Sequence, residues 1–576
     1  MKRMIYLVLA MLLLCGCQES GDAVQVSIVE SEYYTVRNNG QWVIPGGDAV
    51  FYLEMDPGLM VADTDHPGGH SVRISDGLLE LTIEEVRYPA RIRPELTDHY
   101  AAVTYSPNGG EGIDTTRLYD LTHHLRPNTA TDLFSREGYT LESWNTAPDG
   151  SGQRIGLGSR VTADSAGVTL YAQWAKWNEQ SDFTYTAGQS VTITGFHGTG
   201  DTIVIPETID GKAVTAIGHN AFQNCSAKRL ILPKTMKQVA LGAFQNCDFE
   251  SVTVFDTVEE ISDDSFRRCT DLKTIHINAA EAPCGYGWRK ESCYADKVEL
   301  LMTAAGRKKL VCYGGCAMWY NLDSGLMEEA FGGDYAVINL GLNGMVNSAI
   351  QMQIMAAYLE PGDVFFHTPE LSSQTQMMRS LAMDRDDDKL WCGLENNYDL
   401  VGLVEFGSVP GLLDSFCDYL QKKDDASDYS EIYTDSLGRT YLDARGGIPF
   451  ARTETTGTLT DKVFLDPACV DGEAMAVLGQ YYAGMIENGV QVYVGYACVN
   501  LDAVPPEQQR NAPVMDQLFR EAVEAMDGPV VISHLEDYRY HTEDFYDTNY
   551  HLLSGPARRN TALWIRDLKR AMEEET

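Results

Sequence analysis

The sequence predicts a multidomain protein with N-terminal β modules, a short solenoid of repeats and a C-terminal α/β domain of three layers with a parallel sheet. Three observations predict this fold class. Short alternating apolar runs between Gly and Pro fill the first part of the chain, a repeat with a period of 22 residues follows, and short apolar runs then alternate with amphipathic segments. The length of 576 residues agrees, because it corresponds to about three to five domains.

The composition is that of a globular protein, and the net charge limits the classes of partner that it can bind. Hydrophobic residues make up 44% and charged residues 22% of the chain, which is typical of folded domains. The chain has 44 Lys and Arg against 83 Asp and Glu, a net charge of −39. A field of this sign repels phosphate backbones and anionic lipid, so nucleic acid is excluded as the default partner. No metal or dinucleotide fingerprint occurs at the required spacing, so we expect no metal and no cofactor.

The N-terminus has the pattern of a bacterial secretion signal. Lys2 and Arg3 precede an apolar run at 4–14, and small residues follow it. Eleven apolar residues rise about 16 Å as a helix, roughly half of a bilayer core, which is too short for a membrane span. Residues 14–17 resemble the lipobox of bacterial lipoproteins. The resemblance implies that residues 1–17 are a lipoprotein signal peptide and that Cys17 is the lipid anchor of an extracytoplasmic protein; a cleaved signal without lipid is the alternative.

Residues 18–100 are expected to form a β-sandwich-like module. Alternating runs at 24–28, 49–53 and 78–83 are separated by turns rich in Gly and Pro. Alternation at this spacing is typical of strands that bury one face. No residue pattern in this module indicates catalysis.

Residues 101–176 combine aromatic and Gly positions in a recognisable order. Tyr139 and Trp144 precede a turn at 149–152, and Tyr171 and Trp174 follow it. This order resembles the Listeria–Bacteroides repeat, a small β module of bacterial surface proteins. We expect a hairpin turn at 149–152 and a core supplied by the four aromatic side chains. A sugar-binding platform is the alternative interpretation.

Residues 183–279 contain an internal repeat. Segment 221–225 returns at 243–247 and at 265–269, with a period of 22 residues in both steps. This period lies in the range of leucine-rich repeats, and the pattern resembles the BspA-type leucine-rich repeats of bacterial surface proteins. Three aromatic rings are expected to stack as a ladder: Phe222, Phe244 and Phe266. Three cysteines share one register and are interpreted as small buried residues, because a one-dimensional ladder cannot form a tetrahedral metal site: Cys225, Cys247 and Cys269.

Residues 290–576 are predicted to form the α/β domain. Continuous apolar runs at 310–313, 336–339 and 364–367 alternate with helical segments, which predicts βαβ units around a parallel sheet. The stretch 406–464 fits this order less well and is interpreted as an insertion. Sites in such sheets form at the carboxyl ends of the strands. Cys316 follows the first strand, Gly341 and Asn343 follow the second, and Asp547 and His551 precede the last helix.

At these positions the domain resembles the SGNH/GDSL hydrolase superfamily. The resemblance rests on the first strand with its Gly-Gly turn, on the Asn-Leu-Gly segment at 339–341, on Pro-Gly-Asp at 361–363 and on the C-terminal Asp and His. It implies a nucleophile at Cys316, a general base at His551 and an orienting carboxylate at Asp547. It also implies that Gly341 and Asn343 contribute to an oxyanion hole.

Two departures from the family pattern bear on activity. The family has Ser where this chain has Cys316, and Asp547 precedes His551 by four residues where three are usual. The Gly-x-Asn-Asp block is also absent, and residues 367–370 (His-Thr-Pro-Glu) take its place. A thiolate beside an imidazolium is a capable nucleophile, whereas the same substitution also accompanies loss of an active site. Two serines at expected helix N-caps are alternative nucleophiles: Ser324 and Ser348.

The sequence thus predicts a lipid-anchored surface protein whose C-terminal domain is a candidate esterase on an envelope or extracellular carbohydrate. Two alternatives stay open: a non-catalytic adhesin or binding protein that acts through its leucine-rich repeats, and an O-acyltransferase of envelope-polymer assembly. The expected partners are the membrane, through the lipid anchor, and a carbohydrate, a cell-wall polymer or a surface protein.

Overall fold

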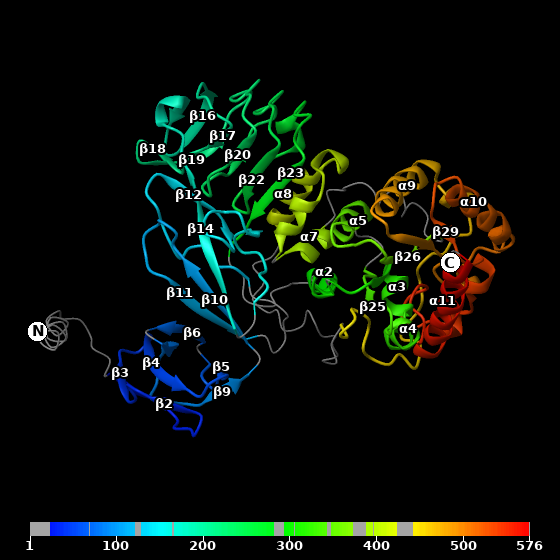
Figure 1. The fold of residues 1–576 in the computed structure, drawn as a ribbon, viewed down its shortest axis with the longest axis horizontal. Helices are drawn as coiled ribbons and strands as arrows, with labels where there is room; N and C mark the ends of the chain where they lie inside the picture. Colours follow the sequence, from blue (N-terminus) through cyan, green and yellow to red (C-terminus); the bar gives the residue numbers. More distant parts are fainter. Residues whose placement is uncertain are drawn as a thin grey trace, which may run out of the picture. The chain divides into compact units, whose positions relative to one another are not determined.

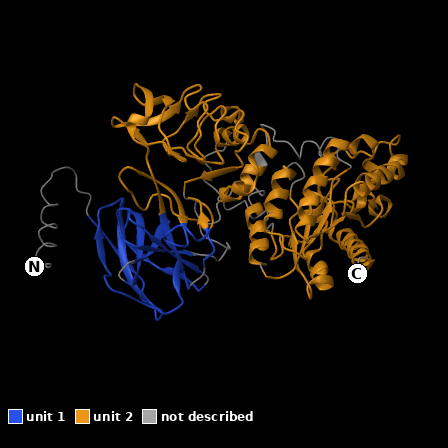
Figure 2. Cartoon of the chain, turned by 45° about the horizontal axis from the view of Figure 1, so that its top comes forward, with its two compact units in different colours: residues 1–127, 145–153, 161–172 blue, residues 128–144, 154–160, 173–576 orange. Residues whose placement is uncertain are grey.

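The computed structural model describes residues 23–67, 69–75, 77–98, 100–120, 128–163, 166–280, 293–304, 306–342, 347–371, 388–395, 397–422 and 442–574. The chain divides into two compact units (Figure 2). Unit 1 comprises residues 1–127, 145–153 and 161–172, and unit 2 comprises residues 128–144, 154–160 and 173–576. Within the described ranges, no helix is long and apolar enough to cross a membrane.

Unit 1 is built from β-strands, as its alternating runs predict (Figure 1). Its first strands are β1 (Val24–Ile28), β2 (Tyr34–Val36), β3 (Gln41–Val43), β4 (Gly47–Met55), β5 (Met60–Thr64), β6 (His70–Ser75), β7 (Leu78–Val86), β8 (Ala90–Ile92), β9 (Pro94–Thr97), β10 (Tyr100–Ser106) and β11 (Thr115–Asp120). In one sheet β1 lies between β3 and β8, and in another the order is β10-β11-β6-β7-β4-β2. Alternate residues of β4 and β7 are fully buried in one core, among them Phe51, Leu53 and Leu81.

The following module adds three strands, and one of its four predicted core aromatic residues is fully buried. These strands are β12 (Tyr139–Asn145), β13 (Arg154–Ile155) and β14 (Val168–Lys176). The predicted turn lies between β12 and β13, with Gly150 at a φ of 78°. Trp144 is buried and donates its indole N–H to the Ala130 carbonyl at 2.7 Å. The other three predicted core aromatics are only partly buried, and Tyr139 instead lies 3.8 Å beneath the Arg136 guanidinium.

The repeat region carries a ladder of phenylalanine rings, as predicted. Its strands are β15 (Phe183–Ala187), β16 (Val191–Phe196), β17 (Thr202–Val204), β18 (Thr208–Ile209), β19 (Lys212–Ile217), β20 (Arg229–Ile231), β21 (Gln238–Val239), β22 (Ser251–Phe255) and β23 (Thr274–Asn278). Strands β17, β20, β22 and β23 form a parallel sheet in this order. The ring of Phe244 lies 5.2 Å from that of Phe222 and 4.9 Å from that of Phe266. Each repeat thus buries its aromatic ring against the next repeat.

The cysteines of the repeats connect neighbouring turns. Cys247 donates to the Phe222 carbonyl and Cys269 donates to the Phe244 carbonyl, both at 3.0 Å. Cys247 is buried, whereas Cys225 and Cys269 are partly buried. The residues directly before the three cysteines adopt left-handed backbone with φ of 62°, 59° and 63°: Asn224, Asn246 and Arg268. The cysteines therefore act as small, hydrogen-bonded core residues.

The end of the repeat region is covered by residues 398–422, which include the first part of the stretch interpreted as an insertion. These residues form η4 (Tyr398–Leu403), which lies just before that stretch, and η5 (Phe406–Ser408) and α8 (Leu412–Lys422), which lie within it. The Phe406 ring lies 6.2 Å from that of Phe266, and the Asp263 carboxylate accepts hydrogen bonds from the N–H groups of Gly411 at 2.6 Å and Leu413 at 2.9 Å. A terminal repeat needs such a cover because no next repeat buries its apolar end. This role explains why the stretch departs from the βαβ order.

The C-terminal part contains a five-stranded parallel sheet. Its order is β25-β24-β26-β27-β29, and all four pairings are parallel. The strands are β24 (Lys309–Gly314), β25 (Ala336–Asn339), β26 (Val364–Thr368), β27 (Gln491–Val494) and β29 (Val530–Val531), and a separate pair consists of β28 (Val499–Asn500) and β30 (Arg539–Tyr540). Every residue of β24, β25 and β26 is buried, in agreement with their continuous apolar sequence.

Helices alternate with these strands. They are α2 (Cys293–Thr303), α3 (Cys316–Asn321), α4 (Ser324–Phe331), α5 (Ser348–Ala356), α7 (Asp388–Leu394), α9 (Gly472–Glu487), α10 (Ala512–Glu524) and α11 (Ser554–Glu574). The N-caps of α4 and α5 are Asp323 and Asn347, which accept from the N–H groups three residues later at 2.9 and 3.0 Å. Ser324 and Ser348 were expected at the N-caps, but they are the first helical residues, one position after the observed caps. Asp and Asn cap helices as well as Ser does.

Candidate functional site

The predicted nucleophile lies at the carboxyl end of the buried strand β24. Gly315 is the N-cap of α3, and Cys316 is the first residue of this helix. A Cβ atom on Gly315 would lie 2.2 Å from Oε1 of Glu370, so a larger residue here would displace that carboxyl group. Cys316 is partly exposed, whereas the remaining residues of α3 are buried. The strand and the helix together therefore present this thiol at the sheet edge where sites are expected.

The predicted base and its carboxylate form a close pair in the loop before α11. Nδ1 of His551 lies 2.6 Å from Oδ1 of Asp547. The loop is closed by an antiparallel bridge between Phe545 and Leu552, and Tyr546 donates its N–H to the His551 carbonyl at 2.7 Å. This closure brings residues four positions apart face to face. The His551 side chain is 6% exposed and that of Asp547 is 36% exposed, so the imidazole is sheltered and the carboxylate reaches solvent.

Helix α3 connects the thiol to this pair. The rings of Tyr320 and His551 stack with centroids 3.7 Å apart and planes inclined by 2°. The Asn321 side chain donates to the Tyr550 carbonyl at 2.8 Å and accepts from the Leu552 N–H at 2.7 Å, so it holds both neighbours of His551. Cys316 and Tyr320 are four residues apart on one helix and therefore share a face, one turn apart. The structure thus brings Cys316, His551 and Asp547 to one region.

Two other histidine–aspartate pairs in the C-terminal part have different surroundings. His541 lies 3.1 Å from Asp502 and His534 lies 3.0 Å from Asp516. Their imidazoles are 65% and 62% exposed. Burial of the imidazole and its stacking on Tyr320 distinguish the His551 pair from these two surface pairs.

A carboxyl group beside the thiol is the main feature that sequence reasoning undervalued. Oε1 of Glu370 lies 3.8 Å from Sγ of Cys316 and accepts the Ala317 N–H at 3.0 Å. Burial raises the pKa of Glu370 above the usual range of a glutamate. The residue lies two positions after the end of β26, so its place near a strand end was the signal in the sequence that pointed to the site.

Replacing Glu370 with Gln is expected to accelerate alkylation of Cys316 by iodoacetamide at pH 8 by about tenfold. Above its raised pKa, Glu370 carries a negative charge that opposes formation of the thiolate nearby. Gln keeps an acceptor for the Ala317 N–H and removes the charge. The rates of both proteins should converge as the pH falls and Glu370 becomes protonated. Peptide mass spectrometry measures the rate of alkylation of Cys316. The control is Glu473→Gln on the surface of α9, which should alkylate at the wild-type rate. Equal rates in wild type and Glu370→Gln at pH 8 would contradict the prediction.

Of the two predicted oxyanion residues, the structure describes Gly341. Gly341 lies against α3, and a Cβ atom there would lie 2.3 Å from the Trp319 nitrogen. Its N–H donates to the Asn339 side chain at 2.9 Å, and its carbonyl accepts from the buried Lys297 ammonium. Burial lowers the pKa of Lys297 to about 7. Asn343 and Cys17 lie outside the described residues.

Arg452 is a site neighbour that no sequence signal indicated. Its guanidinium is buried, donates to the Leu552 carbonyl at 3.0 Å and to the Tyr320 carbonyl, and lies 5.6 Å from the Tyr320 ring centroid. It comes from the stretch interpreted as an insertion, which is why the strand-end argument missed it. The contacts make Arg452 a positioning residue for Tyr320 and for Leu552, the residue after His551.

Asn321→Ala is expected to loosen the loop that carries the histidine. The change removes the acceptor of the Leu552 N–H, at a cost of about 1–3 kcal/mol, and leaves the Tyr550 carbonyl with the Cys498 thiol at 3.4 Å as a donor. Amide hydrogen exchange in residues 545–552 should therefore become faster. Asn488→Ala, which removes a 3.0 Å hydrogen bond to the Leu359 carbonyl elsewhere, is the control and should leave this loop unchanged. Unaltered exchange in the loop of Asn321→Ala would contradict the assignment.

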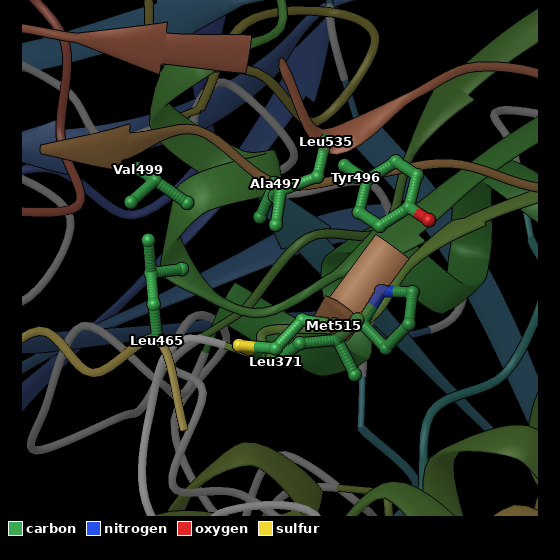
Figure 3. A pocket seen from close by; sticks show the side chains of 8 residues that line it. Leu371, Leu465, Tyr496, Ala497, Val499, Met515 and Leu535 are labelled. Carbon is green, nitrogen blue, oxygen red and sulfur yellow. The ribbon is translucent and has the colours of Figure 1, made fainter. Parts of the chain in front are cut away.

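An apolar pocket adjoins this region (Figure 3). It is lined by Pro369, Leu371, Leu465, Tyr496, Ala497, Val499, Met515 and Leu535. Pro369 and Leu371 are the neighbours of Glu370 in the chain. The cavity volume is about 10 Å³, which is about the space of one water molecule. Among the described residues, no group of three or more His, Cys, Asp or Glu side chains is arranged to hold a metal ion.

Comparison with known proteins identifies the repeats. Residues 201–282 match the family model described as BspA type leucine-rich repeat region, in six copies. This match confirms the predicted BspA-type repeats and fits a surface or binding role, which is typical of proteins with such repeats. No curated protein matches the chain.

Two solved structures are similar to part of the chain. A leucine-rich repeat protein of T. pallidum (TpLRR) is 17% identical with a TM-score of 0.14, and the match covers 19% of this chain and 83% of that one. A leucine-rich repeat protein from Bacteroides ovatus is 20% identical with a TM-score of 0.11, and the match covers 18% of this chain and 44% of that one.

Proposed function

We propose that this protein is a lipid-anchored bacterial surface protein whose C-terminal, SGNH-like domain hydrolyses a small acyl ester on an envelope or extracellular carbohydrate. The match to BspA-type repeats supports the surface location, and the residues at 14–17 support lipid attachment at Cys17. One observation carries the catalytic part. A buried His551, hydrogen-bonded to Asp547 at 2.6 Å, stacks on a tyrosine one helical turn from Cys316.

In the proposed reaction, His551 accepts the proton of Cys316 and the thiolate attacks the ester carbonyl carbon. The carbon–oxygen bond to the carbohydrate breaks, and the leaving oxygen takes the proton from His551. Water then attacks the thioester with His551 again as the base, the acid leaves, and the thiol is restored. Asp547 holds the imidazole in one tautomer and stabilises its charged form.

Turnover at this site depends on the protonation of Glu370 and on the direction of the Gly341 N–H. A protonated Glu370 is compatible with the negatively charged tetrahedral intermediate beside Cys316, whereas an ionised Glu370 repels it. The N–H of Gly341 is directed to Asn339 in this structure, so its use as an oxyanion donor requires a shift of that side chain. If water is excluded and the acyl group passes from Cys316 to a carbohydrate hydroxyl, the same residues catalyse O-acyl transfer.

Hydrolysis of 4-nitrophenyl acetate by the full chain under reducing conditions tests the proposal. Activity should be lost in Cys316→Ala, persist in Cys316→Ser and be unaffected in Cys469→Ala, a buried cysteine outside the site. Mass spectrometry of quenched reactions should find the acetyl group on Cys316. If the wild type has no esterase activity and Cys316→Ser is active, the site is intact but Cys316 does not act as a nucleophile.

Binding through the repeats is the second candidate function, and the family match favours it. If the wild type and all variants lack activity, both with water and with an added carbohydrate as acyl acceptor, the C-terminal domain is a non-catalytic part of a binding protein. In that case the target is a surface protein or carbohydrate recognised by the repeats. Binding of the full chain to purified envelope fractions, compared with a chain carrying substitutions on exposed repeat residues, measures this function.

A further inference from the structure

The carboxyl group of Glu370 lies where the proposed reaction needs the acyl group of a substrate. Its Oε1 atom accepts the Ala317 N–H at 3.0 Å and lies 3.8 Å from Sγ of Cys316. A backbone N–H that stabilises an acyl oxyanion lies about 2.7–3.1 Å from that oxygen, and Ala317 directly follows the proposed nucleophile. An oxygen of the chain itself therefore already contacts both the thiol and the N–H beside it.

The other N–H group assigned to the oxyanion is also taken by the chain. The Gly341 N–H donates to Oδ1 of Asn339 at 2.9 Å. Side-chain oxygens thus accept both of the N–H groups that the carbonyl oxygen of a substrate would need. The described arrangement is that of a site filled by its own side chains.

Strand pairing holds Glu370 opposite Cys316. Gly314 is level with Thr368 in the parallel pair of β24 and β26, and Cys316 and Glu370 each lie two positions further along the chain. The residues on either side of Glu370 are held as well, because the N–H of the buried Leu371 donates to the Pro369 carbonyl at 3.0 Å. Withdrawal of the carboxyl group therefore requires rotation of the Glu370 side chain and leaves the strand in place.

The missing side chain of Gly315 makes room for a carboxyl group beside the thiol. A Cβ atom on Gly315 would lie 2.2 Å from Oε1, 2.5 Å from Cδ and 2.9 Å from Oε2 of Glu370. Hydrolysis of an ester at Cys316 releases a carboxylic acid, which has the same end group as Glu370. Glu370 is thus placed as an analogue of the proposed product that is attached to the chain.

The space that Glu370 fills has the size of a two-carbon acyl group. Replacement of Glu370 by Ala removes a methylene and a carboxyl group, which together correspond to acetate. The adjoining apolar pocket has a cavity volume of about 10 Å³, so it adds about the space of one water molecule. This geometry favours an acetyl group over longer or branched acyl groups.

We propose that Glu370 fills the acyl site of Cys316 as a built-in carboxylic acid, and that its withdrawal opens this site to acetate and acetyl esters. The inference rests on the proposed function, because it names the acyl group that this function removes. Glu370 competes with the substrate for the Ala317 N–H, and the described arrangement is the closed state of the site.

Protection of Cys316 by acetate tests the inference without requiring catalysis. In the full chain, Glu370→Ala should be alkylated by iodoacetamide at pH 8 at least as fast as Glu370→Gln, because both lack the charge and the Ala variant also empties the site. Sodium acetate at about ten times its dissociation constant should slow this alkylation about tenfold in Glu370→Ala. Wild type and Glu370→Gln should not be slowed relative to sodium chloride of equal ionic strength, because their own side chain fills the site. Sodium trimethylacetate, a bulkier carboxylate, should protect none of these proteins.

Ester hydrolysis tests the assigned acyl group in the working enzyme. Relative to spontaneous hydrolysis, the wild type should turn over 4-nitrophenyl acetate at least about a hundredfold faster than 4-nitrophenyl trimethylacetate. In Glu370→Ala the KM for the acetyl ester should fall, because the substrate no longer competes with Glu370, and added acetate should inhibit the variant more strongly than the wild type.

Two controls separate this effect from damage to the fold. Slow amide hydrogen exchange of β24 and β26 verifies that a variant is folded, and Glu370→Ser, which leaves a small polar side chain, replaces Glu370→Ala if the latter does not fold. Glu473→Ala removes an exposed carboxylate of α9 and should match the wild type in every assay.

The outcomes separate this inference from the proposed esterase. Acetate protection confined to the variant with the emptied site supports the inference, even if no ester is hydrolysed and the proposed function fails. Absence of acetate protection in a folded Glu370→Ala, or equal protection by trimethylacetate, overturns the inference and leaves the esterase to be judged by the Cys316 variants. An active wild type with an inactive, folded Glu370→Ala would show that turnover needs the carboxyl group at this place, and would also overturn the inference.

Discussion

Replacing His551 with alanine is expected to lower ester hydrolysis by about a thousandfold. In the proposed reaction the imidazole carries a proton between the Cys316 thiol and the leaving oxygen. Its position is fixed from two sides, by the 2.6 Å contact with Asp547 and by the stacking on Tyr320. Loss of the ring removes the base and leaves the thiol in place, so the rate of acylation of Cys316 measures the effect directly.

The chain contains a matched control for this variant. His541→Ala removes an imidazole that also has an aspartate partner, Asp502, at 3.1 Å, but that is exposed and lies on another loop. We expect His541→Ala to keep full activity. Asp547→Asn should fall between the two, because it keeps the shape of the pair and loses the charge that stabilises the imidazolium. Equal activity of His551→Ala and His541→Ala would contradict the assignment of the base.

The parts of the fold that the sequence predicts are those with a continuous or periodic apolar pattern. Strand β25 occupies the predicted residues, and β24 extends the predicted run by one residue at each end. Such runs have only one way to bury their apolar surface, so local pattern decides the structure. The ladder of Phe222, Phe244 and Phe266 was predictable for the same reason, because a fixed period of 22 residues brings equivalent rings together.

The site was predictable only where residues lie at strand ends or close together in the chain. Asp547 and His551 are four residues apart, and the closed loop around them makes their contact a local event. Arg452 reaches Tyr320 and Leu552 from a separate segment, 132 and 100 residues away from them in the chain. Asn321 likewise gains its role from hydrogen bonds to the loop before α11. Contacts of this kind depend on the packed tertiary structure and leave no local pattern.

Phe244→Ala is expected to open the repeat region locally at a cost of about 3–5 kcal/mol. The ring is fully buried between those of Phe222 and Phe266, and it also lies 5.8 Å from that of Phe249. Its removal leaves a cavity that neither neighbour can fill without leaving its own stack. Because each repeat is stabilised by the two beside it, the loss extends to both adjacent turns.

Amide hydrogen exchange of β20 and β22 measures this effect without requiring the whole chain to unfold in one step. Exchange in these strands should become at least about a hundredfold faster in Phe244→Ala, since 1.4 kcal/mol corresponds to a factor of about ten. Phe244→Leu fills most of the space and should cost less than about 1.5 kcal/mol. Strands of the C-terminal sheet, such as β24, should be unaffected in both variants. If exchange in β20 and β22 were equal in Phe244→Ala and wild type, the aromatic ladder would not be what stabilises the repeats, and the hydrogen bonds of Cys247 and Cys269 to neighbouring turns would have to carry that stability.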